Sequence, residues 1–155
     1  MPRYHVRLAT LDDFDALVRH RIGMFTDMGV AMDVDEVARA FRTWLADMMP
    51  AGVYRGWVVV ADDHEIVGGG AITILPWPPG PQSLLGRVAF AYNVYTEPAH
   101  RGFGLARTVM GEVHAWCRRN GIRTIMLNAS AAGQPLYESL GYEVTRSPMM
   151  STTLE

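Results

Sequence analysis

Hydrophobic positions in the first third of the chain recur about every three to four residues, a spacing that is typical of amphipathic helices. Residues 4–10 alternate weakly between apolar and polar side chains and predict a short strand. Thr10 and Asp13 stand at capping-box spacing, so a helix is expected to begin directly after that strand. Two successive amphipathic helices are therefore predicted, one over residues 14–28 and one from residue 34 to about residue 50.

The pattern changes in the middle of the chain, where apolar and β-branched residues form continuous runs. The runs at 57–61 and 66–75 flank a polar turn and predict a hairpin, and residues 87–96 predict another strand. The remaining expected elements are a helix over 104–120, a strand over 124–128, a short helix over 135–140 and a last strand beginning at 142–145. This order predicts an α/β sandwich built around a mixed sheet.

Length and composition predict one soluble, globular domain over residues 1–155. Hydrophobic residues make up 49% of the chain and charged residues 19%, which is enough apolar material for a packed core. The formal net charge is −2, so we expect no attraction to nucleic acid or to an anionic membrane surface. The longest uncharged stretch, 66–86, is interrupted by prolines and glycines that would break a membrane helix.

Residue usage excludes several kinds of chemistry. The chain has no lysine and its 14 basic residues are all arginine, which excludes Schiff-base chemistry and the lysine-containing phosphate loop. Cys117 is the only cysteine, so neither an intrachain disulfide nor a cysteine-rich metal site is expected. Charged residues near the N-terminus leave no apolar core for a signal peptide. We therefore expect a cytoplasmic protein without a bound metal.

One glycine-containing segment lies between a predicted strand and a predicted helix. Its residues are Arg101, Gly102, Phe103, Gly104, Leu105 and Ala106. Glycines permit a tight loop, and the free amides and positive dipole end of the following helix suit a pyrophosphate. A turn that merely requires small residues is an equal alternative for this loop taken alone. The dinucleotide pattern GxGxxG fails because Arg107 occupies its third glycine position.

Three segments in the second half of the chain carry motifs that occur together in one family. The segment RGFGLA at 101–106 has an Arg, a Gly three residues later and an Ala two residues after that Gly. The segment LYESLGY at 136–142 has a Tyr that is followed four residues later by Gly-Tyr. The segment VYTEP at 94–98 precedes the loop. In these motifs, and in its element order, the chain resembles the Gcn5-related N-acetyltransferases. The resemblance implies a three-layer sandwich, with a mixed, mostly antiparallel sheet of about six to seven strands flanked by four helices.

The resemblance also implies acetyl-coenzyme A as co-substrate. The backbone of Val94, Tyr95 and Thr96 would bond its pantetheine arm as an added strand. The loop 101–106 would hold its pyrophosphate. Ser130 stands where many family members carry an asparagine that contacts coenzyme A, so its hydroxyl either bonds the ligand or caps the following turn.

The implied reaction is attack of a neutral primary amine on the acetyl thioester. Tyr137 would protonate the departing thiolate, because a phenol with a pKa near about 10 stays neutral at pH 7; a packed tyrosine without a role is the alternative. The general base stays unassigned, since Glu97 is either a proton acceptor or a solvated loop charge. By the family's pocket positions, Arg21 and Trp77 are expected to contact the acceptor, with a solvated arginine and a packing tryptophan as the alternatives. Asn93 has the same strand parity as Tyr95 and is expected to face the acceptor with it.

These features predict an acetyl-coenzyme A-dependent N-acetyltransferase acting on a primary amine of a small molecule, peptide or protein. A coenzyme A-binding or sensing module without turnover is the alternative, because the strand 124–128 has no carboxylate and position 130 is a serine. A flavin or nicotinamide enzyme is a third alternative. The resemblance also allows a homodimer.

Overall fold

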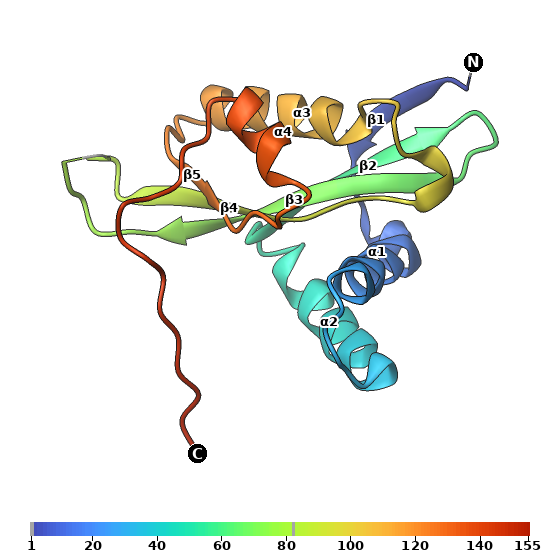
Figure 1. The fold of residues 1–155 in the computed structure, drawn as a ribbon, viewed down its shortest axis with the longest axis horizontal. Helices are drawn as coiled ribbons and strands as arrows, with labels where there is room; N and C mark the ends of the chain where they lie inside the picture. The colour runs from blue at the N-terminus through green and yellow to red at the C-terminus, as the bar shows by residue number, and fades with distance from the viewer. Residues whose placement is uncertain (1, 82) are drawn as a thin grey trace.

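A computed structural model describes residues 2–81 and 83–155, which form three layers (Figure 1). The central layer is a sheet with the strand order β1-β2-β3-β4-β5. One face is covered by α1 (Phe14–Asp27) and α2 (Val34–Met48), and the other by α3 (Leu105–Arg119) and α4 (Gln134–Ser139). The predicted α/β sandwich with four flanking helices is confirmed.

The sheet is mixed and mostly antiparallel, as expected. Its strands are β1 (Tyr4–Leu8), β2 (Tyr54–Ala61), β3 (Ile66–Pro76), β4 (Arg87–Thr96) and β5 (Ile125–Leu127). All neighbours are antiparallel except β4 and β5, which run parallel. The described residues form five strands, so the expectation of about six to seven was wrong. No strand forms at 142–145, where only Tyr142 packs against the core and Val144 is 75% exposed.

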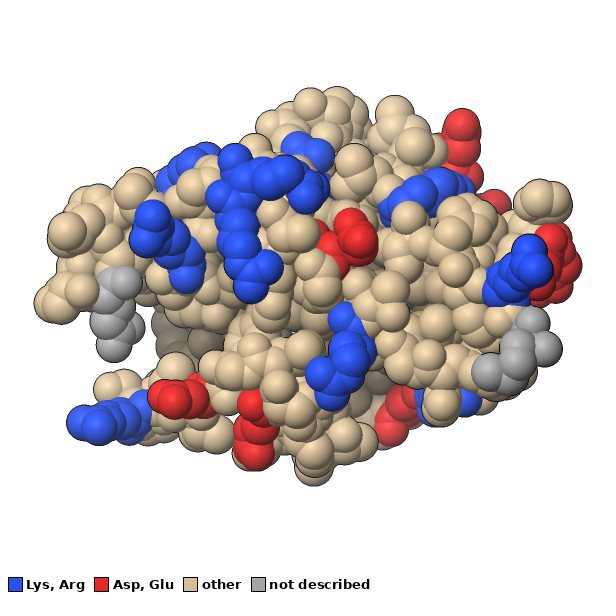
Figure 2. All heavy atoms as spheres, turned by 90° about the horizontal axis from the view of Figure 1, so that it is seen from above, with Lys and Arg blue, Asp and Glu red and all other residues tan. Residues whose placement is uncertain are grey.

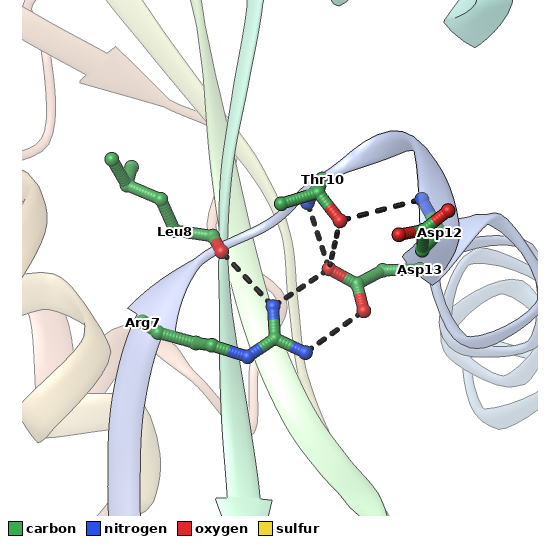
Figure 3. A network of polar contacts seen from close by, with 5 residues as sticks. All are labelled: Arg7, Leu8, Thr10, Asp12 and Asp13. Carbon is green, nitrogen blue, oxygen red and sulfur yellow. Dashed lines mark hydrogen bonds and ion pairs between the residues drawn. The ribbon is translucent and has the colours of Figure 1, made fainter.

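A polar network fixes the junction between β1 and α1 (Figure 3). The two terminal nitrogens of Arg7 donate to the two carboxylate oxygens of Asp13 at 2.8 and 2.9 Å. The backbone N–H of Thr10 donates to Asp13 Oδ2 at 2.7 Å, and the N–H of Asp12 donates to Thr10 Oγ1 at 3.3 Å. Thr10 therefore caps the short 3-10 helix η1 (Leu11–Asp13) in a capping box, as its spacing predicted, and α1 follows at once.

The sheet separates two hydrophobic cores. On the α3 face, Leu105, Val109, Val113 and Cys117 recur every fourth residue and are buried together against β2, β3 and β4. On the other face, residues of α1 and α2 pack around the fully buried Leu45. Strand β4 is thus held between two packed layers, and the chain leaves it toward α3 through a loop at the sheet edge.

Arginine side chains on the face that carries α3 and α4 lie in several separate patches, with less acidic surface between them (Figure 2). This face is locally more positive than the net charge of −2 suggests. Among residues 2–81 and 83–155, no helix is both long enough and apolar enough to cross a membrane.

Candidate functional site

The loop between β4 and α3 presents a row of unpaired backbone amides. Gly102 and Gly104 have φ angles of 86° and 74°, and Gly104 is the left-handed N-cap of α3. The first amide after the loop that donates to a backbone carbonyl is that of Thr108, which bonds the carbonyl of Gly104 at 3.1 Å. In the part of the chain that the structure describes, the amides of residues 102–107 donate to no protein acceptor. The start of α3 is therefore free to bind an anion.

The Arg101 side chain bonds to protein acceptors outside the loop and fixes the loop in place. Its Nε donates to the carbonyl of Thr96 at 2.8 Å, and its terminal nitrogen donates to Asp27 Oδ2 at 2.6 Å. The guanidinium also lies 5.5 Å from the ring centroid of Tyr95. Arg101 thus connects the loop to β4 and to the end of α1.

The end of β4 has an open edge next to the loop. Strand β5 pairs only with Ala89, Phe90 and Ala91, whereas the pairing with β3 continues to Thr96. The β5-side edge of residues 93–96 therefore has no strand partner among the described residues. Backbone groups on this edge are not used by a neighbouring strand, so pairing of Val94, Tyr95 and Thr96 with an extended ligand stays a prediction.

A β-bulge interrupts β4 at the same place. Asn93 and Val94 together lie opposite Gly70, since Tyr92 pairs with Ala71 and Tyr95 pairs with Gly69. Asn93 has a φ of 55°, which places it in the left-handed region. The bulge aims Asn93 at α1, while Val94 packs into the core on the α3 face.

Arg21 and Asn93, both expected near the acceptor, meet across the interface of α1 and β4. Arg21 Nη1 donates to Asn93 Oδ1 at 2.6 Å. Trp77 does not join them. Trp77 follows Pro76, which pairs with Arg87 at the start of β4. Arg87 and Asn93 are separated along β4 by about 20 Å, at ~3.3 Å per residue.

Tyr137 lies in α4, half-buried against the core on the α3 face. Its ring packs edge-on against Tyr142 with the centroids 5.7 Å apart. Burial raises the pKa of Tyr137, so its hydroxyl is neutral at pH 7. Within the described residues this hydroxyl has no hydrogen-bond partner, which leaves its proton free for a ligand.

Ser130 caps the start of α4. Its Oγ accepts from the N–H of Gly133 at 3.1 Å, and its carbonyl accepts from the N–H of Gln134 at 2.9 Å. Of the two roles considered for Ser130, the capping of the turn is therefore present without any ligand. A bond to coenzyme A stays a prediction.

Glu97 is held by α1 instead of lying free in the loop. Its Oε1 accepts from Arg19 Nε at 2.8 Å and lies 3.2 Å from His20 Nε2. Partial burial opposes ionisation of Glu97, but the hydrogen bonds and charges of Arg19 and His20 outweigh it and lower the pKa of Glu97. A carboxylate with a lowered pKa is a weaker proton acceptor, which argues against Glu97 as the base.

The buried partner in this pair is His20, which is 3% exposed and whose ring lies 5.4 Å from that of Tyr95. Burial is the largest influence on its titration and lowers the pKa of His20, with the Glu97 hydrogen bond acting in the opposite direction. Gly23 allows this close approach of α1 to β4, because an added Cβ there would lie 2.6 Å from the hydroxyl of Tyr95.

Comparison with known proteins places this geometry in a family. The model of the Acetyltransferase (GNAT) family matches residues 22–142, which is most of the chain. The chain belongs to the GNAT acetyltransferase family. The match begins inside α1 and ends just after α4, so it contains β4, the amide row and Tyr137.

Solved GNAT structures agree over nearly the full length. A GCN5-related N-acetyltransferase from Ralstonia eutropha JMP134 is 30% identical, with 98% of this chain and 99% of that chain covered and a TM-score of 0.87. A predicted acetyltransferase from Clostridium acetobutylicum, solved with acetyl-CoA, is 25% identical, with 97% and 96% covered and a TM-score of 0.85. Glucosamine-6-phosphate N-acetyltransferase from Arabidopsis thaliana shares the fold at 17% identity, with 99% of each chain covered and a TM-score of 0.69. No curated protein sequence matches this chain.

Two features of this GNAT site were missed from the sequence. His20 is one of them, although its place in the apolar stripe of α1, three residues after Leu17, is an available signal for a buried polar side chain. The other is the bulge at Asn93, which no local pattern indicates. Across the described residues, no group of His, Cys, Asp and Glu side chains is arranged to hold a metal ion.

Proposed function

We propose that this protein transfers the acetyl group of acetyl-coenzyme A to a primary amine. The observation that carries the proposal is the row of unpaired amides at 102–107, next to the open edge of β4. These two features suit the two hydrogen-bonding parts of coenzyme A, its pyrophosphate and its pantetheine amides. The related Clostridium acetobutylicum structure, solved with acetyl-CoA, supports the same assignment.

In this proposal the amine nitrogen attacks the thioester carbonyl carbon directly. A backbone N–H near Val94 stabilises the negative charge that develops on the carbonyl oxygen. The carbon–sulfur bond then breaks, and the thiolate of coenzyme A takes the hydroxyl proton of Tyr137. The amine loses its extra proton to water, because Glu97 is bound by Arg19 and His20.

A coenzyme A-binding module without turnover is the second candidate. The pairing of Glu97 with Arg19 and His20 of α1 favours this second candidate, because Glu97 is then not available as a general base. Ser130 points the same way, since its hydroxyl already caps α4.

Two measurements separate these candidates. Calorimetry with coenzyme A tests the binding site that both candidates require. Release of free thiol from acetyl-coenzyme A, followed across a panel of amino acids, polyamines, aminoglycosides and N-terminal peptides, tests turnover. Amine-dependent thiol release supports the transferase. Tight coenzyme A binding without release for any amine supports the module, and absence of coenzyme A binding contradicts both.

A further inference from the structure

Arg21 is a cation without a counter-ion. Arg7, Arg19, Arg42 and Arg101 each pair with a carboxylate, whereas within residues 2–81 and 83–155 Arg21 has no such partner. Its one hydrogen bond to the protein is the 2.6 Å contact with the neutral Asn93. The other N–H groups of its guanidinium remain available.

The surroundings of Arg21 are aromatic. The guanidinium carbon lies 4.9 Å from the ring centroid of Phe25, 5.0 Å from that of Phe41 and 5.9 Å from that of Tyr92. Burial among them lowers the pKa of Arg21. Burial also raises the pKa of Tyr92 to about 12, so that hydroxyl is neutral at pH 7 and supplies no counter-charge. A partly desolvated positive charge in this setting attracts an anion strongly.

Asn93 adds a second unsatisfied group at the same place. It is 5% exposed, and the bulge turns its side chain toward α1. Its Oδ1 accepts from Arg21, and its buried Nδ2 lies beside the hydroxyl of the buried Tyr54 but makes no hydrogen bond of good geometry in the described structure. Buried donors without partners are rare and costly in proteins. A guanidinium and an amide, both short of acceptors, therefore lie side by side.

We infer that Arg21 and Asn93 anchor a carboxylate of the acceptor, so that the substrate is an amino carboxylate. This inference rests on the proposed acetyltransferase function. The guanidinium fork matches the two oxygens of a carboxylate, and one negative charge balances the single positive charge. A phosphate monoester would bring a charge of about −1.5 to −2 against the same single cation.

The position of the pair fits this role. Asn93 directly precedes Val94, where β4 is expected to meet the pantetheine arm, and neighbouring strand residues are about 3.3 Å apart. A carboxylate held by Arg21 therefore brings an amine a few bonds away within reach of the thioester. The rings of Phe25 and Phe41 give the remainder of the acceptor an apolar surface.

The test compares acceptors that differ only in the charged group. Leucine, phenylalanine, methionine, serine and glutamine are each assayed for thiol release beside their primary amides, their decarboxylated amines and their aminophosphonate analogues. We expect kcat/KM for the preferred amino acid to exceed that of its amide and its amine by at least tenfold. Arg21→Gln is expected to remove this preference, so that the ratio of kcat/KM for the acid to kcat/KM for its amide falls to about one. Arg39→Gln, an exposed arginine on α2, is the control and should keep the preference.

Equal use of acid, amide and amine overturns the inference, as does a preference that survives Arg21→Gln. A preference for the phosphonate overturns the carboxylate assignment in favour of phosphate. If the protein turns over no amine, the carboxylate site is tested separately, by equilibrium binding of the N-acetylated amino acids and their amides to the coenzyme A complex. Acid-selective binding that Arg21→Lys weakens, without a change in coenzyme A affinity, keeps the carboxylate site even if transfer fails. Absence of that selectivity removes it.

Discussion

At the scale of single residues, the hydroxyl of Tyr137 is the group with a free proton beside the core on the α3 face. Tyr142, five residues later, differs from it because its hydroxyl is already engaged with His114 at 2.8 Å. The two tyrosines therefore form a matched pair, one with an available hydroxyl and one with a structural hydrogen bond. Their phenylalanine variants separate catalysis from packing.

We expect Tyr137→Phe to lower the rate of thiol release by about tenfold or more, because the thiolate loses its proton donor. Coenzyme A affinity, measured by calorimetry, should change by less than about twofold. Tyr142→Phe should lower thermal stability through loss of its bond to His114, with turnover retained. A Tyr137→Phe enzyme with the rate of the parent would exclude Tyr137 from the chemistry.

A second residue-scale prediction concerns pH and His20. Burial lowers its pKa in the folded state, so the unfolded chain binds its proton more readily. This contribution to stability is present above the ordinary pKa of histidine, about 6.5, and is lost as the pH falls through the lower folded value. We expect the unfolding free energy of the parent to fall as the pH drops below about 7, and His20→Gln to flatten that slope. The exposed His5→Gln is the control; an unchanged slope in His20→Gln would contradict the assignment.

At the scale of elements, the junction between β1 and α1 determines where α1 lies, and with it Arg21 and His20. Asp13 holds that junction, since its carboxylate accepts from both Arg7 and the backbone of Thr10. The hydrogen bond from Arg7 is the main cause of the lowered pKa of Asp13. Its stabilisation is therefore present above the ordinary pKa of aspartate and lost as the pH falls through the folded value.

We expect Asp13→Asn to lower the free energy of unfolding at pH 7 by roughly 1–3 kcal/mol, because a partly buried network loses its negative charge and one of its two acceptor oxygens. Asp15→Asn is the matched control, because Asp15 pairs with Arg42 at the surface. The Asp15 side chain is 86% exposed to solvent and the Arg42 side chain is 45% exposed. Such a surface pair contributes about 0–1 kcal/mol. Urea unfolding of both variants gives the comparison, and equal losses would show that the junction carries no special stability.

At the scale of the whole molecule, ligand binding and folding are coupled through the loop before α3. A ligand that binds only the folded state at about one hundred times its Kd raises stability by about 2.7 kcal/mol. The amide row lies where the sheet, α1 and α3 meet, because Arg101 ties the loop to both Thr96 and Asp27. Coenzyme A binding should therefore be visible as a thermal shift of the entire domain.

We expect Gly104→Glu to abolish the thermal shift produced by coenzyme A, because a carboxylate would stand at the site proposed for the pyrophosphate. The substitution also introduces strain at a φ of 74°. Gly52→Glu controls for that strain. Gly52 has a φ of 72°, an added Cβ would meet open space there as it would at Gly104, and Gly52 lies just before the start of β2, outside the loop before α3. Gly52→Glu should keep the coenzyme A shift, and a shift that persists in Gly104→Glu would refute the cradle.

Several features of this GNAT protein follow from the sequence alone, because they depend on local spacing. The apolar period located α1 and α2 within about two residues, since one face of each helix must be buried wherever it packs, and the flanking glycines located α3 equally well. Gly102 and Gly104 marked the loop before α3, because few other residues tolerate its positive φ angles. The order of motifs around that loop indicated the family.

The contacts between segments that lie far apart in the chain were decided only by the tertiary structure. Arg21 and Asn93 are 72 positions apart, and their meeting depends on a bulge that turns Asn93 to the α1 face of the sheet. His20 and Glu97 meet for the same reason, because α1 packs across the end of β4. The absence of a strand at 142–145 is also a tertiary outcome, since pairing requires a neighbour and not only a suitable sequence. Local pattern thus determines which elements form, and packing determines which side chains share a site.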